Sequence, residues 1–166
     1  GSALALSGGG ADSQNVILST VNAYAKDSAL QSGGSVTLAA SSDSTIEAAV
    51  VAAALSVAIA PAKSAGSASV GVALARNFIG WNPSTLSESP AEVRAYLENS
   101  SVTAAGPLEL TATSIQEIDA VVGAASVAAV VGKNGVGLAG AGVLTLNTIV
   151  ADVQAFIDED GATGIH

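Results

Sequence analysis

The chain repeats itself, and this repeat constrains its fold more than any other feature of the sequence. Residues 21–50 align without a gap on residues 93–122, with eleven identical positions in thirty. A third copy places Phe156 at the position held by Tyr24 and Tyr96 in the two earlier copies. Internal repeats of this length are typical of folds in which each copy covers the next one. We therefore expect the copies to stack along one axis.

An asparagine followed by apolar residues stands before each copy, at Asn15, Asn77 and Asn147. The middle copy is ten residues longer between this asparagine and the aligned valine than the other two. The extra residues are rich in turn formers, which is typical of a surface loop. The predicted organisation is one continuous domain with the tail of a preceding repeat at 1–14, repeat 1 at 15–76, repeat 2 at 77–146 with an inserted loop at 80–90, and the start of a truncated repeat 3 at 147–166.

Each copy contains short segments with the pattern of β-strands. In residues 93–98 the apolar Val93, Ala95 and Leu97 alternate with larger or charged residues, which is the period of a half-buried strand. Further short strands follow after glycine-containing turns, at 102–104 and 108–112. Strands and turns at this spacing favour a repeat solenoid that is mainly β.

The alanine-rich tracts at residues 45–60 and 115–132 have two interpretations. Both begin near a Ser-x-x-Glu capping box, and alanine favours helices over strands. We therefore expect one short, buried, Ala-rich helix per repeat. The alternative is an all-β solenoid in which these tracts form long hairpins, with Asn134-Gly135 as the turn of the second.

Composition and charge exclude several classes of protein. The net charge is -9 and the five basic residues are scattered, so a nucleic-acid partner is not expected. The chain has no cysteine, which excludes disulfides, cysteine-based metal sites and cysteine nucleophiles. The longest strongly apolar run, residues 48–62, has 15 residues, and a membrane-spanning helix needs about 20. No membrane span is therefore expected.

Few residues are candidates for a functional site, and none is a candidate for catalysis. Trp81 in the inserted loop is the best candidate for contact with a ligand, because an exposed indole combines a large apolar face with a polar edge. Asp158 and Asp160 match part of a calcium loop but lack the remaining ligands of an EF-hand. The recurring aromatic and asparagine positions are predicted to be structural. We expect no cofactor, with calcium at the two aspartates as the alternative.

The repeated strings resemble a known class of sequences. Val-x-Ala-Tyr, then Gly-x-(Leu/Val)-x-Leu-x-Ala, then a Gly/Ala/Val-rich tract ending in Asn-x-Ile resemble the β-strand repeats of very large bacterial surface and secreted proteins, which are filamentous-haemagglutinin-like or adhesin-like. The resemblance implies a non-enzymatic stalk or adhesin segment that is secreted or attached to the cell surface. Its partners would be neighbouring repeats of the parent protein and host or environmental surface ligands.

Two other functions remain open at this point. One is a carbohydrate- or ligand-binding β-helix module, assisted by calcium. The other is a polysaccharide-processing β-helix enzyme, although no copy contains the combination of acid, base and arginine that such chemistry needs.

Overall fold

The computed structural model describes residues 2–158 and residue 165, and almost all of them lie in β-strands. The strands are β1 (Ala3–Ile17), β2 (Thr20–Lys26), β3 (Ala29–Ser32), β4 (Val36–Ile79), β5 (Trp81–Asn82), β6 (Ser87–Glu88), β7 (Ala91–Glu98), β8 (Ser101–Ala104), β9 (Leu108–Ile149) and β10 (Ala151–Asp158). The described residues include no helix, and hence none long and apolar enough to cross a bilayer. The expectation of a mainly-β fold is confirmed.

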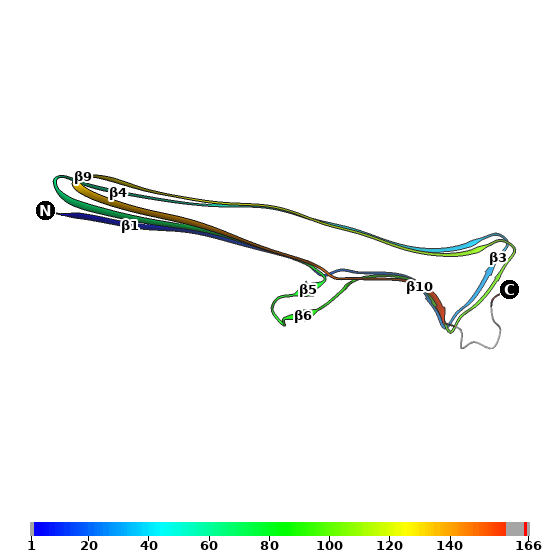
Figure 1. Cartoon of the computed structure of the whole chain (residues 1–166). Helices are drawn as coiled ribbons and strands as arrows, with labels where there is room; N and C mark the ends of the chain where they lie inside the picture. The colour runs from blue at the N-terminus through cyan, green and yellow to red at the C-terminus, as the bar shows by residue number, and fades with distance from the viewer. Residues whose placement is uncertain (1, 159–164, 166) are drawn as a thin grey trace. The chain divides into compact units, whose positions relative to one another are not determined.

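Strands from different copies of the repeat lie next to one another, parallel and in register. β7 lies between β2 and β10, with Val93 opposite Val21 on one side and opposite Val153 on the other. β3 pairs with β8 in the same way, and β4 is hydrogen-bonded to both β1 and β9 (Figure 1). Because a shift of one residue would turn every inward side chain outward, matching residue types at matching positions maintain this register.

The chain forms two compact units, and each unit consists of three segments from successive copies. Unit 1 contains Gly1–Asn15, Ile46–Asn77 and Ile118–Asn147, and unit 2 contains Val16–Thr45, Phe78–Glu117 and Thr148–His166. The long strands β4 and β9 contribute residues to both units.

Unit 1 has an interior built from small side chains, which allow β4 to fold back on itself. The hydroxyl groups of Ser56 and Ser67 are hydrogen-bonded to each other, so β4 reverses direction between them. The Ser69 hydroxyl donates to the carbonyl oxygen of Ala54 across the same interior, at 3.1 Å. These bonds satisfy hydroxyl groups that are buried, which offsets the cost of removing them from water.

A glycine allows β1 to approach β4 in the same unit. A Cβ atom added to Gly9 would lie 2.2 Å from the carbonyl oxygen of Ala53, so no other residue fits there without a backbone shift. The core around this point is aliphatic and small, and Val50 and Ala73 are two of its buried members.

The prediction of one short Ala-rich helix per repeat is wrong, because residues 45–60 and 115–132 lie in β4 and β9. Between residues 54 and 60 of β4 the buried residues are small, such as Ala58 and Ala60, whereas the exposed residues between them include Val57 and Ile59. Both faces are apolar, so hydrophobicity does not alternate, but side-chain size does. Pairing with neighbouring copies outweighs the helix propensity of alanine, which is worth less than about 1 kcal/mol per residue.

Unit 2 has a core formed by equivalent residues of successive copies. Val93 and Ala95 of β7 are fully buried and pack with Ala40, with Val21 of β2 and with Leu110 of β9. Complete burial of one valine or leucine side chain stabilises a fold by about 1.5–3 kcal/mol, so β7 contributes strongly to this unit.

The corner after β2 and the corner after β7 have the same backbone geometry. Asp27 and Asn99 both have positive φ values, 51° and 45°. Asp and Asn enter this left-handed region more readily than other non-glycine residues. The Asn99 side-chain amide donates to the Asp27 carboxylate at 2.6 Å, so the two corners are also bonded to each other.

The inserted residues leave the sheet of unit 2 and return to it at almost the same point. The Gly80 amide donates to the carbonyl oxygen of Ile17 (2.8 Å), and the Ala91 amide donates to that of Val150 (2.9 Å). Between them β5 and β6 form a short antiparallel pair that projects from the sheet (Figure 1). Gly80 has a φ of 73°, and a Cβ atom there would lie 1.9 Å from the Val150 carbonyl oxygen. The excursion therefore requires glycine at its first residue.

Candidate functional site

The three repeated aromatic residues form one stack on the outward face of β2, β7 and β10. The ring centroids of Tyr24 and Tyr96 are 5.3 Å apart with an interplanar angle of 10°, and those of Tyr96 and Phe156 are 5.0 Å apart at 2°. The in-register pairing of the strands produces this arrangement. A sugar-binding aromatic platform must offer a ring face to its ligand. Both faces of Tyr96 are covered by its neighbours, so the middle of the stack cannot serve as such a platform.

Charged side chains of the same sheet are paired with each other. The Arg94 guanidinium contacts Glu92 (Nη1 to Oε1, 2.9 Å) and Asp152 (Nη2 to Oδ2, 2.6 Å). Its hydrogen bond lowers the pKa of the Asp152 carboxyl, and a second hydrogen bond, from Gln154, acts in the same direction.

A second ion pair joins the ends of β2 and β7. Lys26 Nζ lies 2.5 Å from Glu98 Oε1, and the hydrogen bond and charge of Glu98 raise the pKa of Lys26. Neither ion-pair group was predicted from the sequence. Opposite charge at equivalent repeat positions is a signal for the Lys26–Glu98 pair, whereas Arg94 and Asp152 do not occupy equivalent positions.

The repeated asparagines form a ladder of side-chain hydrogen bonds in unit 1. The Asn15 amide nitrogen donates to the Asn77 side-chain oxygen (2.8 Å), and the Asn77 amide nitrogen donates to the Asn147 oxygen (2.9 Å). Asn77 is 0% exposed. The amide can both donate and accept, so it is the simplest side chain that continues one pattern through successive copies.

The remaining predicted site residues are not brought together. Trp81 is half-buried in β5 and lies opposite Glu88 of β6. Asp158 ends β10, where its carbonyl oxygen accepts from the Asn99 amide at 3.0 Å. Asp160 lies outside the described residues. Among residues 2–158 and 165, no group of three or more His, Cys, Asp or Glu side chains could hold a metal ion.

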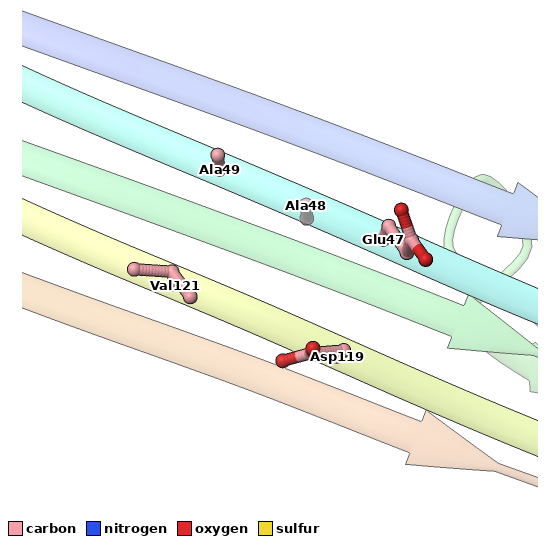
Figure 2. Close-up of a pocket in the computed structure, with 5 residues that line it drawn as sticks. All are labelled: Glu47, Ala48, Ala49, Asp119 and Val121. Atoms are coloured by element: carbon pink, nitrogen blue, oxygen red, sulfur yellow. The ribbon is translucent and has the colours of Figure 1, made fainter.

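Unit 1 has an open groove of about 340 Å³ on its surface, lined by Glu47, Ala48 and Ala49 of β4 and by Asp119 and Val121 of β9 (Figure 2). Its five lining residues include two carboxylates but no nucleophile, cation or aromatic ring.

Comparisons with known proteins identify no relative. No protein-family model matches the chain, and no curated protein or solved structure does so either.

Proposed function

We propose that the chain is a section of a β-solenoid with a structural, non-enzymatic role, as a stalk or adhesin repeat segment of a large exported bacterial protein. The observation that carries this proposal is the aromatic stack, in which Tyr24, Tyr96 and Phe156 repeat one contact across three copies. A protein whose work is to be long and stiff needs each copy to bond to the next, and this contact does so.

The chemistry of the paired side chains supports the same role. The asparagine ladder, the Arg94–Asp152 ion pair and the Lys26–Glu98 pair all connect one copy to the next.

Photo-oxidative crosslinking of tyrosine tests the stacked architecture directly. Tyr24 and Tyr96 are the two tyrosines of the chain, and their rings are stacked. We expect efficient dityrosine formation within single chains. Tyr24→Phe is the matched control, since it keeps the stack but removes one phenol. Absence of intramolecular dityrosine in folded wild-type chain would contradict the architecture.

Duplication of one copy tests the proposed role. A chain with residues 15–76 repeated directly after residue 76 should keep its β-type circular dichroism and gain resistance to urea, because stability in stacked repeats grows with each added interface. An insert of the same composition in shuffled order is the control. A duplicated chain that unfolds more easily than the original would argue against a modular array.

Export is tested on intact cells of the source organism. An antibody against this chain should label them without permeabilisation. Labelling that appears only after the cells are opened would exclude a surface location.

A ligand-binding module is a second candidate, favoured by one observation. Trp81 lies half-buried on a loop that projects from the sheet and that the pairing around it does not require. Glycan-array binding by the wild type, lost in Trp81→Ala, would support this candidate. Equal binding by both chains would exclude Trp81 as the contact.

A further inference from the structure

The strands β2 and β10 form the two edges of the sheet in unit 2, and these edges are complementary. β7 uses one edge to pair with β2 and the other to pair with β10. The three strands are copies of one sequence, so the outer edge of β10 is equivalent to the edge of β2 that pairs with β7. In the same way, the outer edge of β2 is equivalent to the edge of β7 that pairs with β2. Among the described residues, no strand pairs with either outer edge.

The apolar side chains at the outer edge of β10 are incompletely covered. Val153 and Ile157 are each 45% exposed, whereas their partners in the middle strand, Val93 and Leu97, are 0% exposed. β7 has a neighbour on both sides, whereas β10 has one among the described residues. A further strand in the same register would bury what β10 leaves exposed.

We propose that the outer edge of β10 binds the outer edge of β2 of a second copy of this chain, head to tail and in the register of the internal pairs. This inference rests on the proposed stacked architecture. Residues 152–158 would lie opposite residues 20–26, so that Phe156 continues the aromatic stack onto Tyr24 of the next molecule. The contact repeats an interface that already exists twice within the chain, between β2 and β7 and between β7 and β10.

Charge at the junction favours the same pairing. Asp158 is in register with Glu98 inside the chain, which places two carboxylates side by side. Across the proposed junction Asp158 faces Lys26 of the next copy, which is a cation. Such a contact joins different surfaces of two copies and does not close, so it leads to linear assemblies that grow with concentration.

A tyrosine relocation tests the register of this junction. In the double variant Tyr96→Phe with Phe156→Tyr, the two phenols stand on the two outer strands, with a phenylalanine ring between them inside each chain. We expect photo-oxidation to give a ladder of covalent multimers that extends as concentration rises. Adding Tyr24→Phe removes the partner and should abolish the ladder. Single-chain bands at all concentrations, or a ladder that survives Tyr24→Phe, would overturn the proposal.

Asp158→Lys provides an independent test that does not depend on crosslinking. Within the chain the lysine would lie beside Glu98 and gain an attractive partner, whereas across the junction it would repel Lys26. We expect sedimentation to show association about fivefold weaker than in the wild type, with folding retained. Unchanged association would overturn the proposal. If wild-type chains form intramolecular dityrosine but none of these assays detects the junction, the stacked architecture stands and only this inference fails.

Discussion

Removal of the Asn77 side chain should destabilise the protein more than removal of either neighbour in its ladder. Asn77 accepts one hydrogen bond from Asn15 and donates another to Asn147, at 2.8 and 2.9 Å, and it is completely buried. A hydrogen bond of this kind contributes about 0.5–1.5 kcal/mol net. Asn77→Ala loses both bonds and leaves a small cavity, so we expect the free energy of unfolding to fall by about 2–3 kcal/mol.

The two ends of the ladder are the matched controls. Asn15→Ala and Asn147→Ala each break one bond. Asn147 is exposed, so in Asn147→Ala water can take the place of the lost side chain as the partner of Asn77. Each should cost about 1 kcal/mol. Urea unfolding followed by circular dichroism measures all three, and unchanged m-values would show that the change is in stability. A cost for Asn77→Ala no larger than that of either end variant would refute the ladder as a source of stability.

Asn77→Asp separates the hydrogen bonds from the space that the side chain fills. The carboxylate is nearly the same size as the amide, but it cannot donate to Asn147 and it places a charge in a buried position. We expect it to cost more than alanine at neutral pH. Burial raises the pKa of this carboxyl in the folded state, so the cost should start to shrink above about pH 4, as the buried group takes up a proton, and should be lost below about pH 4, the pKa of an aspartate in the unfolded chain. A penalty independent of pH would show that this position is open to water.

Three further changes test other parts of the fold. Gly80→Ala should lower the free energy of unfolding by more than the strain of a left-handed non-glycine residue, which is about 1–3 kcal/mol, because the added Cβ atom would also meet a carbonyl oxygen. Thermal unfolding followed by circular dichroism measures the loss, and Gly33→Ala, where a Cβ atom meets no other atom, is the control. Tyr96→Leu should lower the free energy of unfolding by about 1–3 kcal/mol, roughly twice the loss caused by a leucine at Tyr24 or Phe156, because Tyr96 stacks on two rings and each of the others on one. Equal losses for the three variants in urea unfolding would contradict the aromatic contribution. Arg94 lowers the pKa of Asp152 in the folded state, so the Asp152 carboxylate stabilises the fold at pH values above its unfolded pKa, and this stabilisation is lost as pH falls through its folded pKa. The difference in free energy of unfolding between wild type and Asp152→Asn should therefore be seen at pH 6 and vanish in strong acid.

The repeat made much of the fold predictable from the sequence. Identical or similar residues at equivalent positions indicated which side chains would lie together, and Tyr24, Tyr96 and Phe156 do form a stack. The same alignment predicted the insertion, because the number of residues from Asn77 to Val93 differs from that from Asn15 to Val21.

The alanine-rich tracts were not predictable by hydrophobic periodicity. In β4 the exposed Val57 and Ile59 are as apolar as the buried Ala58 and Ala60, so the usual contrast between faces is missing. The capping-box pattern at Ser44 and Glu47 was misleading for the same reason, since the serine is buried and the glutamate exposed as alternate strand residues are. The useful signal was alternation of side-chain volume, which a narrow interior imposes.

The ion pairs of the candidate site were less predictable than the fold, because their members are distant in sequence and unlike in type. Arg94 and Asp152 are not equivalent positions, and they meet only because β7 and β10 pair in register. A search for recurring residues finds identical side chains and overlooks partners of opposite charge in adjacent strands.

The excursion between Ile79 and Ala91 has an evolutionary consequence. The chain departs and rejoins beside the same two neighbours, so residues 81–90 can be replaced, lengthened or removed by evolution without a change in the pairing on either side. Sequence changes in this segment therefore have little effect on the sheet. A lineage can change what it displays to its surroundings at this position and inherit the scaffold underneath unaltered.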